Sequence, residues 1–562
     1  MPDAALPTPV STITPTETAF PTLTPAQMDR IAKHGRIRTV KPGEILVEVG
    51  SPTVPFFVMK TAQVEIVKPS ERGDTVVVVH SHPGNFSGEV NMISGRRAML
   101  QIRASSAGDV IEVAREELIK LVQTDYDLSE ILMRAFILRR IELINNRLGD
   151  VMVIGSMHLP STLRIKEFLT RNNHPFVYVD LDRDPEVQEL LDHFHVDPAC
   201  IPVVICRGQT VLRNPSNAEI ANCLGFNDNI DQTQVRDMVI IGAGPAGLAA
   251  AVYGASEGLD VLVFESNAPG GQAGSSSKIE NYLGFPYGVS GQELAGRAFT
   301  QAQKFGAQIV IAKGATQLAC ARKPYAIEIE GDSSSRVPAR TVVIASGAQY
   351  RRLKLDNLTQ FEGVGVYYGA TKVEEQLCNG DEVIIVGGGN SAGQAAVYLS
   401  QSTKKVHILV RSSGLNESMS KYLILRIDDS PNIQLHVCTE ITALEGGDHL
   451  ERVTWRDKNT GETETHPIRH VFLMTGAIPN TVWLHGCVAL DDNGFIKTGP
   501  DLSKDDLSRA QWPLARPPFL LETSLPGVFA VGDARGGNIK RVASAVGEGS
   551  IAVAFVHRVL HE

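Results

Sequence analysis

A Cys-x-x-Cys pair is absent from this sequence of 562 residues. The chain has seven cysteines, and they are scattered singly: Cys200, Cys206, Cys223, Cys320, Cys378, Cys438 and Cys487. This spacing argues against a disulfide framework and against a zinc site. We therefore expect reduced thiols, a cytoplasmic location and no metal site.

Long apolar runs and an excess of positive charge are also missing. No stretch approaches the roughly 18 apolar residues that span a bilayer, and the formal net charge is -10. The Thr- and Pro-rich start, residues 1–22, lacks the basic and apolar regions of a secretory signal, so we expect a disordered tail there. These absences predict a protein with neither a membrane nor a nucleic acid as a partner.

The clearest positive feature is a Gly-x-Gly-x-x-Gly turn between a hydrophobic strand and a helix. It comprises Gly242, Gly244 and Gly247, and a second hydrophobic strand then ends at Glu265. The first glycine allows a tight turn, the second lets backbone approach a pyrophosphate, and the third lets the helix pack on the strand. Glu265 can accept a hydrogen bond from a ribose hydroxyl. The pattern predicts a dinucleotide-binding domain, with the pyrophosphate at a helix N-terminus.

A second strand, glycine-rich turn and helix begins at Val383. At the end of its next strand stands Arg411, where an NAD enzyme usually carries an acid. An arginine there can pair with the 2′-phosphate of NADPH, so NADPH is favoured over NADH. The residues that we expect to bind NAD(P)H are Gly387, Gly389, Asn390, Ser391, Ala392 and Arg411.

From the first turn to about residue 560, the chain resembles the low-molecular-weight thioredoxin reductases. The segments 269–272 and 279–286 match the second flavin segment of that family, and Gly527–Asp533 matches its last flavin signature. The resemblance implies FAD in the first dinucleotide fold and a nicotinamide donor in the second. The expected FAD-binding residues are Gly242, Gly244, Pro245, Ala246, Gly247, Glu265, Gly271, Gln272, Asn281, Gly532, Asp533, Lys540, Arg541 and Val542.

The redox-active dithiol of that family is replaced in this chain. The family carries Cys-Ala-Thr-Cys just before the second nucleotide strand, and the aligned residues here are Gly369-Ala370-Thr371-Lys372. Cys378, in the following polar stretch, has no partner thiol nearby in sequence, and we interpret it as structural. No catalytic residue is therefore assigned, since the two dithiol positions are Gly369 and Lys372, and we expect low disulfide-reducing activity.

The N-terminal part shows short strands broken by turns, followed by a helical pattern from Leu128 to Leu148. The spacing around Gly88 and Glu89 resembles the cyclic-nucleotide-binding domains, in which this Glu binds the ribose hydroxyl and a downstream Arg binds the cyclic phosphate. Here Ala98 falls at the phosphate position, directly after Arg97. The candidate cyclic-nucleotide residues are Gly88, Glu89 and Arg97, and the alternative is a degenerate regulatory or assembly domain.

Residues 150–226 alternate between strand and helix patterns and resemble the thioredoxin/glutaredoxin fold. Ile201-Pro202 resembles that family's cis-proline. Ser156–Pro160 stands where the family carries its redox cysteines, and a hydroxyl and an imidazole cannot perform dithiol exchange. The resemblance therefore implies a degenerate domain, in which Cys200 and Cys206 are interpreted as buried structural thiols.

These patterns together predict a multidomain chain. It would contain a β-roll cyclic-nucleotide-binding-like domain, an α/β thioredoxin-like domain and two nested, three-layer α/β Rossmann-like domains. The expected boundaries are a tail at 1–22, the cyclic-nucleotide-binding-like domain at 23–149, the thioredoxin-like domain at 150–226, the FAD-binding domain at 236–350 and 481–562, and the NAD(P)H-binding domain at 351–480.

The leading hypothesis is an FAD-dependent, NAD(P)H-oxidising enzyme that passes electrons to an unidentified acceptor, a small molecule or a protein, with an N-terminal regulatory half. One alternative is a redox or nucleotide sensor with little turnover. The other is a true thioredoxin-disulfide reductase that uses a non-standard thiol. The family resemblance also implies a homodimer.

Overall fold

The computed structural model describes residues 18–69, 74–146, 148–182, 201–207, 210–331, 336–484 and 486–562. The chain divides into two compact units. The first unit comprises Met1–Ile154, Asn173–Ile230 and Gln303–Val310, and the second comprises Gly155–Asn172, Asp231–Ala302 and Ile311–Glu562.

The first unit begins with two antiparallel sheets, of order β1-β7-β3 and β2-β6-β4-β5. They share a core with helix α4, in which the rings of Phe56, Phe86 and Phe136 pack 5.7 to 6.4 Å apart. The predicted β-roll is confirmed. The elements are α1 (Pro25–Ala32), β1 (Arg36–Val40), β2 (Ile45–Val47), β3 (Phe56–Met59), β4 (Val64–Lys68), β5 (Thr75–His80), α2 (Asn91–Ser94), β6 (Gln101–Ala104), β7 (Gly108–Val113), α3 (Arg115–Thr124) and α4 (Tyr126–Asn145).

The first unit also contains a four-stranded sheet of order β11-β10-β8-β9. Strand β10 pairs antiparallel with both β8 and β11, and the peptide bond Ile201-Pro202 is cis, as the sequence predicted. The helix expected near residues 185–194 lies outside the described residues, as does Cys200. The elements are β8 (Val151–Gly155), α5 (Pro160–Arg171), β9 (Phe176–Asp180), β10 (Val203–Cys206), β11 (Thr210–Arg213) and α7 (Asn217–Leu224), with α5 grouped by its contacts into the second unit.

The larger sheet of the second unit has the order β14-β13-β12-β17-β16-β15, with β28 also on β17. Strands β12, β13, β17 and β28 pair in parallel. The central strands are buried along most of their length, which explains why most of their residues are hydrophobic. The elements are β12 (Arg236–Ile241), α8 (Pro245–Ser256), β13 (Val261–Glu265), η2 (Ala273–Ser275), α9 (Gly291–Lys304), β14 (Gln308–Ile311), β15 (Ala315–Ala319), β16 (Tyr325–Ile329), β17 (Arg336–Ile344), β28 (Val528–Ala530), η5 (Gly532–Ala534) and α15 (Val542–Leu560).

The stretch of sequence between β17 and β28 of the first sheet forms a second parallel sheet, of order β19-β26-β20-β21-β22. Strands β18 and β27, which precede and follow the second parallel sheet in the sequence, pair antiparallel. Strands β23, β24 and β25 form a separate antiparallel sheet. The elements are β18 (Ala348–Tyr350), α10 (Leu358–Phe361), β19 (Val366–Tyr367), α11 (Lys372–Leu377), β20 (Glu382–Val386), α12 (Asn390–Leu399), β21 (Lys405–Leu409), α13 (Lys421–Asp428), β22 (Ile433–His436), β23 (Thr439–Gly446), β24 (Leu450–Asp457), β25 (Thr463–His466), β26 (His470–Leu473), β27 (Ala477–Pro479), η3 (Val482–Leu484), η4 (Gly499–Asp501) and α14 (Lys504–Arg509).

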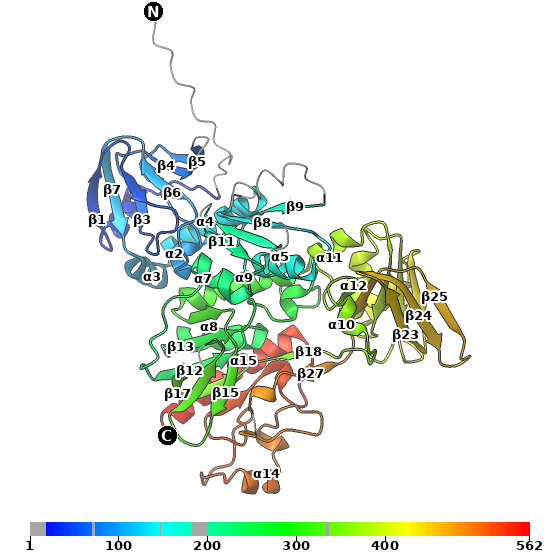
Figure 1. Cartoon of the computed structure of the whole chain (residues 1–562). Helices are drawn as coiled ribbons and strands as arrows, with labels where there is room; N and C mark the ends of the chain where they lie inside the picture. Colours follow the sequence, from blue (N-terminus) through cyan, green and yellow to red (C-terminus); the bar gives the residue numbers. More distant parts are fainter. Residues whose placement is uncertain are drawn as a thin grey trace, which may run out of the picture. The chain divides into compact units, whose positions relative to one another are not determined.

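Helix α15 is long and apolar enough to cross a membrane by length and composition, which the sequence pattern did not predict. A single such helix is weak evidence of a membrane span. In the structure α15 packs on α8 (Figure 1), so closely that a Cβ at Gly549 would lie 2.2 Å from the carbonyl oxygen of Ala246. Its buried residues include Ala552 and Val556, and 28% of its apolar window is buried.

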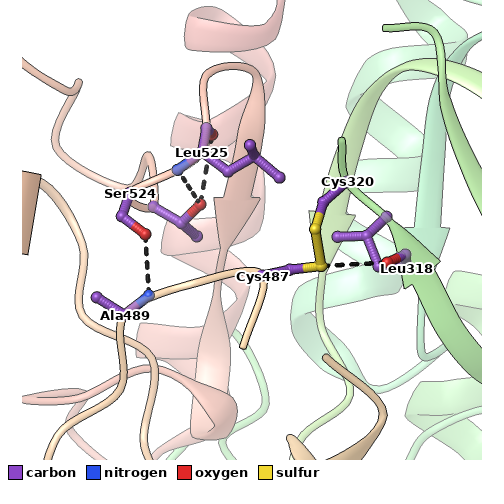
Figure 2. The surroundings of a disulfide bond; sticks show 7 residues. Leu318, Cys320, Cys487, Ala489, Ser524 and Leu525 are labelled. Carbon is purple, nitrogen blue, oxygen red and sulfur yellow. Dashed lines mark hydrogen bonds between the residues drawn. A yellow bond between two sulfur atoms is a disulfide. The ribbon is translucent and has the colours of Figure 1, made fainter. Parts of the chain in front are cut away.

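The expectation that all cysteines are reduced is wrong for two of them. Cys320 and Cys487 form a disulfide (Figure 2), and the Sγ atom of Cys487 lies 3.1 Å from the carbonyl oxygen of Leu318. The two cysteines are 167 residues apart, and they meet because β15 packs against η3. No local spacing rule could have revealed this pair. Among the described cysteines, four are free: Cys206, Cys223, Cys378 and Cys438.

Candidate functional site

Two positions of the first glycine-rich turn have no room for a side chain. Gly242 has φ +105°, and a Cβ there would lie 2.3 Å from the carbonyl oxygen of Ala345. A Cβ at Gly247 would lie 1.9 Å from the carbonyl oxygen of Gly242. These contacts bring α8 directly against the end of β12, which is the close packing that the spacing predicted.

The middle glycine of this turn faces open space. A Cβ at Gly244 would have only the Cα atom of Gly271 within 4 Å, at 3.9 Å. Gly244 is also the N-cap of α8, and no side chain accepts from the first N–H groups of this helix. These groups are therefore available to an anion, so the turn fits a pyrophosphate.

Glu265, at the end of β13, is fixed by two backbone donors. Its Oε2 accepts from the N–H of Ala243 at 2.8 Å, and its Oε1 accepts from the N–H of Asn267 at 2.9 Å. Burial raises the pKa of this carboxyl group, while both hydrogen bonds oppose the shift. Because each carboxylate oxygen has a further lone pair, Glu265 can still accept from a ribose hydroxyl.

Asp533 follows β28 and lies beside the start of α15. Lys540 Nζ donates to the carbonyl oxygen of Asp533 at 2.8 Å and lies 3.9 Å from its Oδ1. Burial raises the pKa of Asp533, and Lys540 opposes the shift. Helix α15 begins after Arg541 without a side-chain cap, so its first N–H groups also have no side-chain acceptor.

The second glycine-rich turn repeats the geometry of the first. Gly387 has φ +145°, and a Cβ there would lie 2.4 Å from the carbonyl oxygen of Met474. Gly389 has nothing within 4 Å of its Cβ position, and it caps α12 without a side-chain hydrogen bond. Asn390 Oδ1 accepts from the N–H of Ser420 at 2.8 Å. Arg411 is exposed beyond the end of β21.

Both turns line one cleft of about 1730 Å³ within the second unit. Of the predicted nucleotide-binding residues, Gly247 and Ala392 are not in its lining. Gly247 instead packs against the turn, and Ala392 is fully buried. The lining includes Gly242, Gly244, Pro245, Ala246, Glu265, Gly271, Gln272, Asn281, Gly532, Asp533, Lys540, Arg541, Val542, Gly387, Gly389, Asn390, Ser391 and Arg411.

Arg171 and Tyr350 are among the lining residues that were not expected from the sequence. Arg171, on α5, donates from Nη2 to the carbonyl oxygen of Gly271 at 2.8 Å. Tyr350, on β18, lies beside Ser391, and burial raises the pKa of its hydroxyl group. Arg171 lies in a segment with no nucleotide motif, and it is 100 residues away from the loop that it contacts, so sequence spacing carried no signal for it.

Of the two positions of the missing dithiol, Gly369 lies at this cleft, and Lys372 is not in its lining. A Cβ at Gly369 would be 3.6 Å from the Cβ of Ser275, an ordinary contact. Thr371 caps α11, and Lys372 is the first residue of that helix. Cys378 is fully buried, and burial raises the pKa of its thiol to about 12. Cys378 is therefore an unreactive thiol, as the sequence predicted.

The first unit has a separate, mostly apolar cavity of about 80 Å³ in the β-roll. Gly88, Glu89 and Ala98 line it, as does Arg139. The guanidinium of Arg139 donates to three carbonyl oxygens, those of Ala19 (2.8 Å), Phe86 (3.0 Å) and Gly88 (2.9 Å). Ala19 is buried, so the last residues of the predicted tail pack against this domain.

The charged groups of the predicted cyclic-nucleotide site are engaged by other parts of the protein. Arg140 Nη1 lies 3.4 Å from Glu89 Oε2, and burial raises the pKa of Glu89. Arg97 is outside the cavity lining, and its Nη1 donates to the carbonyl oxygen of Gly50 at 3.4 Å. The structure thus brings Gly88 and Glu89 together but does not bring Arg97 to them.

Two glycine-rich turns, each on a parallel sheet and both open to one cleft, define a protein class that binds two nucleotides side by side. The family described as pyridine nucleotide-disulphide oxidoreductase matches residues 236–549, which is more than half of the chain. The chain belongs to this family and is an FAD-dependent oxidoreductase. Residues 37–125 match the cyclic nucleotide-binding domain.

Similar proteins include a thioredoxin reductase of Ureaplasma parvum, which is 31% identical over 57% of this chain and 96% of its own length. Another is a thioredoxin reductase of Bacillus subtilis, which is 30% identical over 59% of this chain and 97% of its own length. Among solved structures, T. acidophilum thioredoxin reductase superposes with a TM-score of 0.51 at 29% identity, covering 58% of this chain and 99% of its own. This similarity supports the predicted Rossmann-like architecture.

Proposed function

We propose that this chain oxidises NAD(P)H with FAD and passes the electrons to an unidentified acceptor. The electrons do not pass through a redox-active disulfide of the kind that the family carries at the positions of Gly369 and Lys372. The similarity to thioredoxin reductases supports the first half of the proposal. The second half rests on Gly369 and Lys372, because neither residue has a thiol. A dithiol exchange step needs a thiolate and a resolving thiol.

In this proposal the first turn holds FAD. The uncapped N–H groups of α8 bind the pyrophosphate, Gly244 lets it approach the backbone, and Glu265 accepts from a ribose hydroxyl. Asp533 and the start of α15 bind the rest of the cofactor. The remaining proposed FAD contacts are Gly242, Pro245, Ala246, Gly271, Gln272, Asn281, Gly532, Lys540, Arg541 and Val542.

The second turn holds NADPH in preference to NADH. The uncapped N–H groups of α12 bind its pyrophosphate, and the exposed guanidinium of Arg411 pairs with the 2′-phosphate. When both cofactors are bound, the nicotinamide supplies a hydride and the flavin accepts it. The protein contributes binding, orientation and the exclusion of water from the cleft.

The decisive experiment restores the dithiol. The double variant Gly369→Cys/Lys372→Cys introduces both thiols at the aligned positions, and the free space around Gly369 admits the new Cβ. We expect the purified wild-type flavoprotein to be reduced rapidly by NADPH without air but to turn over thioredoxin poorly. The double variant should reduce thioredoxin at least about tenfold faster than the wild type.

The single variant Gly369→Cys is the matched control, since one thiol cannot resolve a mixed disulfide. Brisk thioredoxin reduction by the wild type would overturn the proposed acceptor. Slow or absent reduction of the flavin by NADPH would overturn the enzymatic proposal as a whole and would favour a sensor.

For the first unit, we propose a regulatory domain at residues 23–149 and a degenerate thioredoxin-like domain at 150–226. The strand order around β10 supports the second assignment. In the second unit, we propose FAD binding by residues 236–350 and 481–562 and NAD(P)H binding by 351–480. The homodimer and the cytoplasmic location stay predictions, which light scattering and cell fractionation would check.

A further inference from the structure

Two free cysteines of the first unit face each other on neighbouring elements. Cys206 is the last residue of β10, and Cys223 lies in the last turn of α7, which packs against β10 and β11. The residue after Cys206, Arg207, donates to the carbonyl oxygen of Cys223, so the two cysteines lie close together, and each thiol affects the pKa of the other. The two cysteines do not have the spacing of a Cys-x-x-Cys motif. It is the packing of α7 on β10 that brings them together.

The surroundings of the pair are polar and contain charges of both signs. Arg207, next to Cys206, donates from Nη2 to the carbonyl oxygen of Cys223 at 2.5 Å, and its Nε lies 3.5 Å from Asp150 Oδ2. Cys206 is 1% exposed, whereas Cys223 is half-buried. A reagent in solution therefore reaches Cys223 first, with Cys206 behind it.

We propose that Cys206 and Cys223 form a thiol–disulfide exchange site that is oxidised by low-molecular-weight disulfides. Cys223 is the attacking thiol and Cys206 the resolving thiol. This site is distinct from the flavin cleft and from the missing dithiol of the second unit, so it does not depend on the function proposed above.

The ionisation of the pair suits this division of roles. The hydrogen bond from Cys206 and the charge of Arg207 lower the pKa of Cys223 to about 7, against the opposing effect of burial. The same hydrogen bond, followed by burial, raises the pKa of Cys206. Once Cys223 has reacted, it is no longer a thiolate, so the main cause of the raised pKa of Cys206 disappears.

The exchange balances in two steps. The Cys223 thiolate attacks one sulfur of a disulfide RSSR, which forms a Cys223–SR bond and releases RS⁻. Cys206 then loses its proton to water and attacks the Cys223 sulfur, which forms the Cys206–Cys223 disulfide and releases a second RS⁻. The protein dithiol is oxidised by two electrons, and RSSR is reduced to two thiols.

The test treats the full-length holoprotein with oxidised glutathione in the absence of NADPH, blocks remaining thiols and maps tryptic peptides without reduction. Cys200 and Cys206 fall in the same tryptic peptide, because no Lys or Arg lies between them. All variants therefore carry Cys200→Ser, so that a crosslink between this peptide and the Cys223 peptide identifies Cys206. We expect the Cys206–Cys223 crosslink. Cys206→Ser should instead accumulate a stable glutathionyl adduct on Cys223, and Cys223→Ser should show neither product.

Cys438→Ser is the matched control, because Cys438 is a half-buried free thiol of the second unit, and its loss should change nothing. Flavin absorbance and melting curves report whether each variant folds. As a second readout, alkylation of Cys223 at pH 7 should slow about five- to tenfold in Cys206→Ala, which has no donor at this position, since the pKa of Cys223 then returns towards about 8.5.

An unmodified Cys223, or a glutathionyl adduct that persists in the presence of Cys206, would overturn the proposal. An alkylation rate that is equal with and without Cys206 would also overturn it.

Discussion

The cavity of the first unit is lined by Gly88 and Glu89, and the cleft of the second is lined by two glycine-rich turns, but the polar groups around the two sites are used in opposite ways. In the cleft, the N–H groups at the starts of α8 and α12 have no side-chain acceptor. In the cavity, Arg139 donates to three carbonyl oxygens and Arg140 pairs with Glu89. The comparison shows that the spacing of a motif is not enough to predict ligand binding. The polar groups of the motif must also be free of other protein partners, so that they can bind the ligand.

The largest effect should come from filling the first turn. Gly244→Val places a side chain where a pyrophosphate must approach, while its Cβ clashes with nothing in the protein. We expect flavin content to fall about 100-fold or more, as judged by the ratio of absorbance at flavin and protein wavelengths. Gly447→Val is the control, because Gly447 also has nothing within 4 Å of its Cβ position and lies in a turn away from the cleft. Equal flavin content in both variants would contradict the assignment.

The next effect concerns the choice of nicotinamide cofactor. Arg411→Ala removes the cation expected at the 2′-phosphate, and a charge-assisted hydrogen bond contributes about 1.5–3 kcal/mol. The KM for NADPH should therefore rise about 10- to 100-fold, with little change for NADH, in steady-state flavin-linked oxidation. A similar loss for both cofactors would show that Arg411 acts on structure rather than on the phosphate.

The cavity of the first unit should make stability depend on pH through His80. Burial, with a further contribution from Arg139, lowers the pKa of His80 from 6.5 to about 3 in the folded protein. The unfolded chain therefore binds a proton between these values that the folded chain excludes, so stability falls as the pH drops from about 6.5 towards 3.

Each pH unit in this window costs at most about 1.4 kcal/mol. Calorimetric melting at pH 7 and pH 5 should show a smaller difference for His80→Phe than for the wild type. His82→Phe, at an exposed neighbour, should keep the wild-type difference. If the two variants behave alike, His80 is not the source.

The smallest effect tests whether the cavity can be converted. Ala98→Arg places a cation at the family's phosphate position, and we expect affinity for cyclic AMP to rise about tenfold over the wild type by isothermal titration calorimetry. Arg97→Ala should leave binding unchanged, because the Arg97 guanidinium is turned to the carbonyl oxygen of Gly50. Tight wild-type binding that Arg97→Ala abolishes would instead restore the role that the sequence suggested for Arg97.

Features that depend on neighbouring residues were predictable from the sequence. The left-handed backbone at Gly242 and the parallel pairing of β12 with β13 follow from a local strand, turn and helix pattern. Features that depend on distant residues were not. Arg171 contacts Gly271, and Cys206 lies near Cys223, although no motif links these segments. In the sequence, nothing distinguishes Arg139 from the other arginines of its helix.

The disulfide between Cys320 and Cys487 encloses the whole of the second parallel sheet, from β19 to β26. A protease that cuts the chain once anywhere between these cysteines would leave two fragments still covalently joined. On a gel, the nicked protein should migrate as one band without reductant and as two bands with it. The chain between Cys320 and Cys487 is thus closed into a covalent ring. A single cut opens this ring but releases neither of the two fragments.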